Sequence, residues 1–89
     1  FGLDLKGIGL TGADLTGSVF DSCNLESAKF EDCKLGGVTF AQNNMCKADF
    51  RGAVDYYFSL EGNRITGARF SLPEAVNLLS ALGIVIEET

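Results

Sequence analysis

Large apolar side chains recur at every fifth position along most of the chain. The series runs Leu5, Leu10, Leu15, Phe20, Leu25, Phe30, Leu35, Phe40, Met45 and Phe50, is interrupted at Asp55, and resumes at Leu60, Ile65 and Phe70. An α-helix needs an apolar period near 3.6 and an ordinary strand a period of two, so neither element explains this spacing. A fixed repeat predicts a solenoid, in which each unit buries its apolar face against its neighbours.

Two other positions of the repeat support this prediction. The residue two places before each large apolar residue is mostly small, as expected for a second inward position where space is tight. The residue two places after it is mostly glycine or a small polar residue, which predicts a turn in every unit. Asn43 and Asn63 occupy the inward position, and we expect their amides to hydrogen-bond from layer to layer; polar residues lining a binding site are the alternative.

The repeat units resemble those of the pentapeptide-repeat family, whose units read A(D/N)LxX. The matching units include 13–17 (Ala-Asp-Leu-Thr-Gly), 23–27 (Cys-Asn-Leu-Glu-Ser) and 48–52 (Ala-Asp-Phe-Arg-Gly). The resemblance covers roughly residues 3–70 and implies an all-β solenoid, a right-handed β-helix of quadrilateral cross-section with four units in each coil. About three and a half coils would then stack at the usual strand spacing of about 4.8 Å. Such stacking would place Phe30, Phe50 and Phe70 in one column and Lys29, Asp49 and Arg69 in another.

The interruption at Asp55 is the first candidate site. A buried, unpaired carboxylate is unfavourable by several kcal/mol, so we expect the chain to turn Asp55 towards a partner or towards solvent. The distorted corner would carry the adjacent aromatic residues Tyr56, Tyr57 and Phe58. These residues would either pack over the end of the rod or form a binding surface for a partner protein.

The pattern changes after Phe70, and residues 71–89 are expected to form a C-terminal cap on the repeat domain of residues 1–70. Ser71 and Glu74 read as a capping box, and Gly83 is placed to end a helix. That helix carries a broad apolar stripe, which we interpret as a cap or dimer surface formed by Leu72, Val76, Leu78, Leu79 and Leu82. Residues 84–86 (Ile-Val-Ile) read as a short strand. A solenoid end exposes apolar core and unpaired strand edges, so a cap is required there.

Composition narrows the function classes. The formal charge of −5 argues against a basic nucleic-acid binder, so we expect no direct contact with nucleic acid. The three cysteines are an odd number, which argues against a disulfide framework and for a reducing, cytoplasmic location; Cys23 and Cys33 should be buried and Cys46 exposed. No apolar run is long enough to suggest a membrane span. Because Phe1 already lies within the repeat pattern, we expect that an upstream portion has been removed.

Three functions remain open, and none of them is enzymatic. With no histidine, no phosphate-binding loop and no CxxC pair, the sequence predicts no catalytic residue, cofactor or metal site. The first hypothesis is a rigid scaffold that binds a partner protein, and resemblance to the family allows a homodimer through the C-terminal helix. The second is a DNA mimic, because some family members bind DNA gyrase and protect it from quinolones. Against mimicry, residues 1–72 hold nine acids and seven bases, a balance of only −2. The third is a structural module without a partner of its own.

Overall fold

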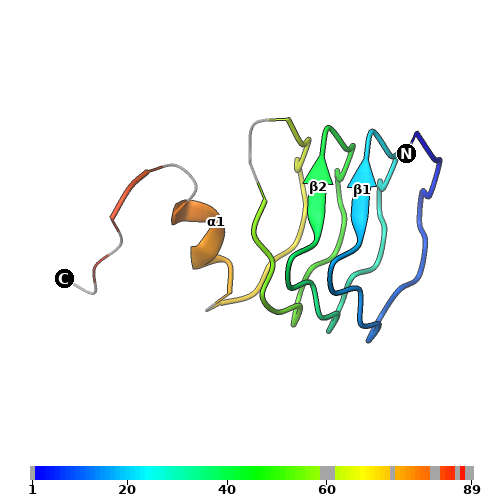
Figure 1. The fold of residues 1–89 in the computed structure, drawn as a ribbon. Coiled ribbons are helices and arrows are strands. Elements are labelled where there is room, and N and C mark those ends of the chain that lie inside the picture. Colours follow the sequence, from blue (N-terminus) through cyan, green and yellow to red (C-terminus); the bar gives the residue numbers. More distant parts are fainter. Residues whose placement is uncertain (1, 59–61, 73, 81–82, 86, 88–89) are drawn as a thin grey trace.

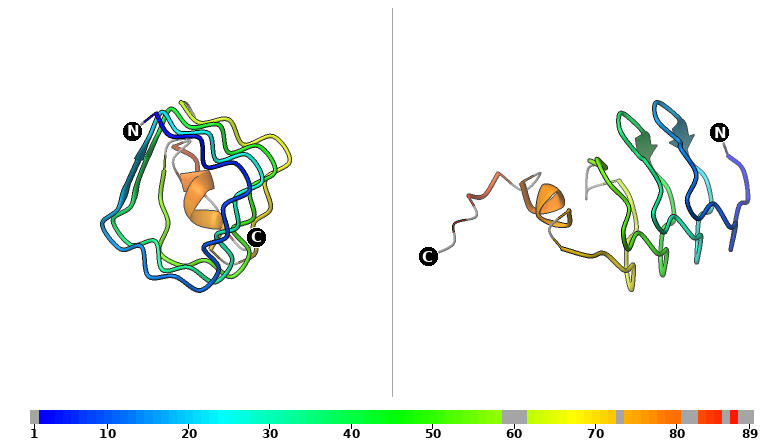
Figure 2. Two further views of the ribbon diagram at one scale, coloured as in Figure 1. Left: turned by 90° about the vertical axis from the view of Figure 1, so that its right-hand side faces the viewer. Right: turned by 90° about the horizontal axis from the view of Figure 1, so that it is seen from below.

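The chain winds into a stack of parallel coils, of which the computed structural model describes residues 2–58, 62–72, 74–80, 83–85 and 87. Parallel bridges join residues that stand twenty positions apart, as in the series Asp4, Asn24, Asn44 and Arg64. The coils lie side by side in Figure 1 and superimpose when viewed along the stack in the left panel of Figure 2. The sequence prediction of a β-helix with a twenty-residue coil is therefore confirmed.

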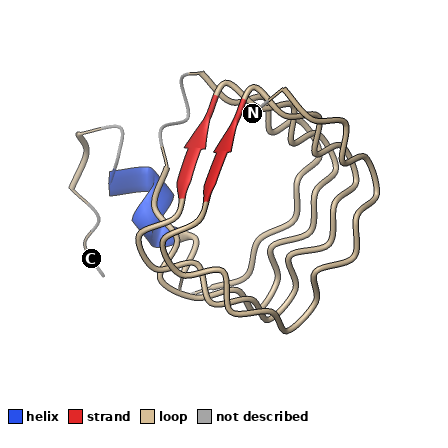
Figure 3. Cartoon of the chain, turned by 45° about the vertical axis from the view of Figure 1, so that its right-hand side comes forward, coloured by secondary structure: helices blue, strands red, loops and turns tan. Residues whose placement is uncertain are grey.

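Regular strands are short and few. Strand β1 (Val19–Asp21) pairs in parallel with β2 (Thr39–Ala41), with Phe20 opposite Phe40. Most other contacts between the described coils are isolated bridges, so most of the chain is drawn as loop in Figure 3. A turn in every five-residue unit leaves only a few extended residues on each side of a coil. The description of the protein as all-β therefore applies to its pattern of pairing and not to its strand content.

Each regular unit turns at a residue with left-handed backbone conformation. In the second coil these residues are Ser22, Ser27, Asp32 and Gly37, with φ between 57° and 68°. Tight turns precede the next unit, as where the Cys33 N–H donates to the Phe30 carbonyl at 3.2 Å. Four such corners in twenty residues give a four-sided coil. Glycine favours this conformation, yet serine, aspartate, glutamine and lysine also adopt it here, because the surrounding coils impose it.

The every-fifth residues form the core. Phe30, Phe50 and Phe70 stack in one column with ring centroids 5.0 and 5.2 Å apart, and Phe20 stacks on Phe40 at 5.4 Å. Edge contacts then join the two columns, such as Phe30 to Phe40 at 5.7 Å. Complete burial of one such ring contributes about 1.5–3 kcal/mol of hydrophobic stabilisation. The fully buried core also includes Leu25, Ala28, Cys33, Leu35, Met45, Ala48 and Ala53.

Asn43 and Asn63 form the expected ladder inside the coils. The Asn43 Nδ2 atom donates to Asn63 Oδ1 at 3.4 Å and to the Phe20 carbonyl at 2.9 Å. The Asn43 Oδ1 atom accepts the backbone N–H of Cys23 at 2.8 Å. Both amides are buried and hydrogen-bonded, so the structural interpretation holds for them.

Cysteine placement follows the repeat with one correction. Cys23 and Cys33 are buried, as the sequence predicted. Cys46 was expected to be exposed but is only partly so. It lies in a coil with neighbours on both sides, where its carbonyl accepts the Ser27 N–H and the following Lys47 N–H donates to Thr66.

The C-terminal segment departs from the sequence prediction. Helix α1 (Val76–Ser80) is five residues long and begins later than the predicted capping box would place it. Ile84 and Val85 are exposed and form no strand, and Ile86 lies outside the described residues. A strand needs a neighbouring backbone to pair with, and within the described residues the chain beyond α1 extends away from the coils (Figure 1). The predicted boundary between residues 70 and 71 stays a prediction.

Candidate interaction surface

The interruption at Asp55 keeps the coil in phase while exchanging which side chains face inward. Left-handed residues occur at Gly52 and Asp55, so this interval is three residues in place of the regular five. Gly62, ten residues after Gly52, is left-handed again, so the turn pattern resumes two regular units later in the same phase. Asp55 has φ of 63° and is exposed, as the cost of burying a carboxylate predicted.

Tyr56 and Phe58 enter the core in place of the missing leucine. Tyr56 is 1% exposed and packs near Phe50 and Phe70, with ring centroids 6.1 and 5.8 Å apart. Phe58 is 3% exposed and meets Phe40 at 5.2 Å. Tyr56 and Phe58 are therefore core residues, which corrects their interpretation as residues that contact a partner. The physical reason is that removing an aromatic ring from water into the core is favourable.

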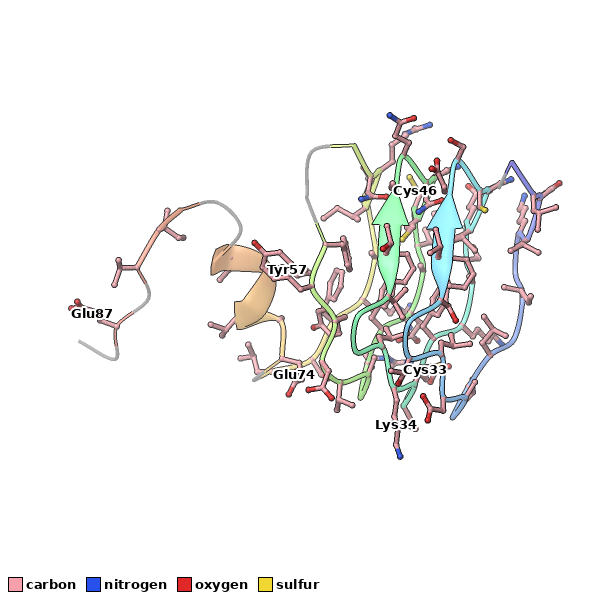
Figure 4. All side chains as sticks on the ribbon, in the orientation of Figure 1. Cys33, Lys34, Cys46, Tyr57, Glu74 and Glu87 are labelled. Atoms are coloured by element: carbon pink, nitrogen blue, oxygen red, sulfur yellow. The ribbon has the colours of Figure 1, made fainter. Side chains whose placement is uncertain are left out.

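Tyr57 is the one aromatic residue of this segment that faces solvent, with 61% of its surface exposed. Figure 4 shows Tyr57 at the end of the molecule that carries α1, together with Glu74. Of the three aromatic residues predicted for partner binding, the structure therefore leaves only Tyr57 accessible. Phe58 could have been assigned to the core, because it stands two places before Leu60, at the usual inward position of the repeat.

Two side chains of the C-terminal segment accept hydrogen bonds that, elsewhere in the stack, go to backbone carbonyls of the next coil. Within the stack, a backbone N–H donates to the carbonyl nineteen residues later, as from Asp32 to Arg51 and from Leu35 to Val54. At the last coil, the Gly52 N–H instead donates to Ser71 Oγ at 2.9 Å, and the Asp55 N–H to Glu74 Oε2 at 3.2 Å.

This role replaces the predicted capping box at the start of the helix. Ser71 and Glu74 satisfy donors on the coil edge, where backbone groups would otherwise be unpaired. The sequence points to both residues, but the start of a helix and the end of a coil stack both need side-chain oxygens that accept hydrogen bonds from backbone N–H groups. Only the fold shows which donors they serve.

The apolar stripe of the predicted cap helix divides between core and surface. Leu78 is 5% exposed and belongs to the core cluster, so it is not available as a dimer contact in this structure. Val76 is partly buried. Leu72 and Leu79 are 78% and 40% exposed, and Leu82 lies outside the described residues. Three of the exposed large apolar residues at this end of the chain are therefore Tyr57, Leu72 and Leu79, and we call these three residues the terminal surface.

One buried side-chain atom of the interrupted coil, the Tyr56 hydroxyl, makes no hydrogen bond within the part of the chain that the structure describes. Burial, with a smaller contribution from the Glu74 carboxylate, raises the pKa of Tyr56 to about 12. A phenol held neutral in this way cannot act as a base near neutral pH, and its effect is on stability.

The described residues hold no group of three or more His, Cys, Asp or Glu side chains that could bind a metal ion. Among the same residues, no helix is long and apolar enough to cross a bilayer. The chemistry that the terminal surface offers is hydrophobic contact by two leucines and one aromatic ring. Such contacts suit recognition of another protein.

Comparison with known proteins agrees with the coil geometry. The family model for pentapeptide repeats matches eight copies, over residues 2–37 and 23–54. A pentapeptide repeat protein from the Arabidopsis thaliana thylakoid lumen matches at 25% identity and a TM-score of 0.74, covering 80% of this chain and 49% of that one. QnrB1, a plasmid-mediated fluoroquinolone resistance protein, matches in its trypsin-treated M102R form at 18% identity and a TM-score of 0.47, covering 94% and 43%. The chain thus spans about half the length of these structures. No curated protein matches it.

Proposed function

Because this chain belongs to the pentapeptide-repeat family, we propose that it is a non-enzymatic scaffold that binds a partner protein through the terminal surface. The observation that supports this most directly is the exposure of large apolar side chains at one end of the coil stack, 61% for Tyr57 and 78% for Leu72. Buried aromatic and aliphatic anchors dominate the energy of protein interfaces. An exposed tyrosine and two exposed leucines in this part of the chain can supply such anchors.

The coil stack supports the proposal by holding this surface in place. The core beneath it is closely packed, and Phe50 contacts both Tyr56 and Phe58, which flank Tyr57 in the chain. The segment that carries Leu72 is fixed by the hydrogen bonds of Ser71 and Glu74 to the last coil. A surface that is ordered before binding loses little conformational entropy when the partner arrives.

Site-specific photo-crosslinking tests the scaffold proposal. A photoreactive phenylalanine analogue replaces Tyr57 in the intact natural protein, expressed in its own cells. The matched control places the same analogue at Val19, which is 64% exposed on the face of β1. We expect a discrete adduct from position 57 that is lost on the additional substitution Leu72→Ser. Equal adducts from both positions, or none from position 57, would exclude the terminal surface as the partner site.

We propose further that the C-terminal segment caps the last coil and that a second copy pairs through α1. Leu78 in the core cluster supports the cap, and the exposed Leu79 on the same helix supports pairing. Light scattering at several protein concentrations measures the mass of the particle. A dimer that becomes monomeric with Leu79→Glu supports pairing, and a monomer at all concentrations refutes it. A cytoplasmic location stays a prediction.

Gyrase binding by DNA mimicry is the alternative function. A polyanion mimic needs a sustained negative stripe. In one column of the described coils, Lys29, Asp49 and Arg69 instead alternate in sign. The charge pattern therefore favours the scaffold. A supercoiling assay with purified gyrase, with and without a quinolone, separates the two functions, because inhibition or protection at micromolar protein would replace the scaffold with mimicry.

A further inference from the structure

A groove on the side of the coil stack carries an excess of positive charge, although the whole chain has a formal charge of −5. It has a volume of about 520 Å³ and is lined by Ser27, Lys29, Lys47, Asp49, Gly67 and Arg69. We call it the cationic groove. It is formed by three successive coils and does not include any residue of the terminal surface.

The repeat itself creates the groove by placing two columns side by side. One column contains Lys29, Asp49 and Arg69, which are joined by parallel bridges. The neighbouring column contains Ser27, Lys47 and Gly67 at the left-handed turn positions. Two of these three residues are small, so Lys47 has the one long side chain of this column within the groove.

Lys47 leans over the glycine that follows it in the column. A Cβ atom at Gly67 would lie 3.4 Å from Lys47 Cγ, an ordinary van der Waals contact, so the stem of Lys47 lies directly against this glycine. Lys47 also has φ of 60°, a conformation that glycine adopts at lower cost. The coil therefore holds a lysine at a turn where most units of this chain have a smaller residue.

The single carboxylate of the groove is already engaged. The Arg51 guanidinium donates to both carboxylate oxygens of Asp49, with Nη2 to Oδ2 at 2.6 Å and Nε to Oδ1 at 2.9 Å. Hydrogen bonds from Arg51 hold the pKa of Asp49 below its usual value, so the pair stays charged at neutral pH. Among the described residues, Lys29 and Lys47 form no ion pair. The groove thus keeps uncompensated cations after Asp49 is counted.

We propose that the cationic groove binds a small molecule that carries a chain of two or more phosphate groups. Its volume falls within the range of small-ligand sites. Lys29 and Arg69 lie two coils apart, about 10 Å at the usual strand spacing, so linked phosphates can contact both cations where they stand, whereas a single phosphate needs the two side chains to converge on it. Lysine offers phosphate a point charge and arginine a planar pair of donors, and both are present. This proposal does not depend on the scaffold function.

Titration with sodium tripolyphosphate tests the proposal by calorimetry and by amide chemical shifts at low salt. We expect saturable binding with shifts centred on Lys47 and Gly67. Lys47→Gln and Arg69→Gln should each weaken binding about tenfold, the size of one charge-assisted hydrogen bond. Lys34→Gln is the matched control, because Lys34 is exposed but lies in a different column, next to Asp14 and Val54, and its affinity should not change.

Asp49→Asn should change tripolyphosphate affinity in the opposite direction. Asparagine keeps an Oδ1 acceptor for the Arg51 N–H, and Asn24 and Asn44 already occupy the equivalent position of other units, so the fold should tolerate the change. Removing the only carboxylate should tighten tripolyphosphate binding several-fold. Circular dichroism checks that every variant is folded.

Two further ligands show which part of a phosphate compound the groove recognises. Adenosine triphosphate with the same affinity as tripolyphosphate would show that the phosphates alone are recognised, and tighter binding would show that the groove also holds the nucleoside. Inorganic phosphate binding as tightly as tripolyphosphate would overturn the requirement for linked phosphates. Equal weakening by Lys34→Gln and Lys47→Gln, or no saturable binding at all, would overturn the site itself.

Discussion

Truncation of Phe50 gives the most direct test of the packing described above. Phe50 is fully buried and lies between Phe30 and Phe70, with ring centroids 5.0 and 5.2 Å away. Three further rings lie within about 6 Å of it, those of Phe40, Tyr56 and Phe58. It therefore links the regular coils to the interrupted one, and Phe50→Ala should leave a cavity in the middle of the stack.

The expected loss is about 3–5 kcal/mol of unfolding free energy. A buried aromatic side chain removes about 150–250 Å² from water, which at 25 cal/mol per Å² sets an upper bound of about 4–6 kcal/mol. Alanine retains part of that burial, and measured Phe→Ala substitutions in cores fall in the lower range. A chain of this length has a total stability of about 4–13 kcal/mol, so the variant should be severely destabilised.

Guanidinium denaturation measures the effect, followed by circular dichroism and by tyrosine fluorescence, since the chain has no tryptophan. Agreement of the two signals tests for a single cooperative transition. Lys47→Ala is the control, because Lys47 is exposed and alanine has a similar left-handed backbone cost; its effect should be below about 0.5 kcal/mol. Phe50→Leu keeps most of the volume and should lose about 1–2 kcal/mol if Phe50→Ala does not fold. Equal midpoints for Phe50→Ala and Lys47→Ala would refute the register of the repeat.

Three other predictions follow from the polar groups of the structure. Asn43→Ala should destabilise the protein by about 2–4 kcal/mol in the same assay, because buried backbone groups lose their partner, and a neutral result would contradict the ladder. Glu74→Ala should speed amide hydrogen exchange at Asp55, whereas Glu74→Gln should restore protection, because the amide oxygen can accept the same bond. Tyr56→Phe should raise stability by about 1 kcal/mol or more at neutral pH, because it removes a buried, unpaired hydroxyl, and Tyr57→Phe should have no effect. The pKa of Tyr56 is raised to about 12 from an unfolded value near 10. The free energy of unfolding therefore includes the full contribution of the neutral phenol below pH 10 and loses it between about pH 10 and 12. Tyr56→Phe should reduce this alkaline loss of stability, and an unchanged pH profile would refute the assignment.

The repeat could be predicted because its physical signal is local and redundant. Each unit has the same pattern, an apolar residue followed two places later by a residue that can form a turn. A departure in one unit therefore does not alter the register. Position in the repeat accounts for the burial of Phe30, Phe50 and Cys23 and for the ladder of Asn43 and Asn63. Once the twenty-residue coil is known, the neighbours in each column follow as well.

The interrupted coil and the C-terminal segment could not be predicted in the same way. A single exception carries no repetition to fix its register, so the repeat places Phe58 at an inward position but does not distinguish Tyr56 from Tyr57. The backbone at Asp55 decides among them, because its left-handed conformation shifts the turn and directs Tyr56 and Phe58 inward while Tyr57 faces solvent. Periodicity also placed the start of the helix too early, because α1 begins at Val76, and among the described residues of the predicted stripe Leu78 is the one in the buried core cluster.

By itself the amino-acid sequence determined the family, the coil, the core columns and the outward charge columns, because a solenoid places residues by simple translation along its axis. Tertiary structure alone decided which aromatic side chain stays accessible, and which donors Ser71 and Glu74 satisfy. It also decided that Lys29, Lys47 and Arg69 share one groove. These features depend on contacts between columns and at the end of the stack, where the packing of particular side chains and not the repeat sets the geometry.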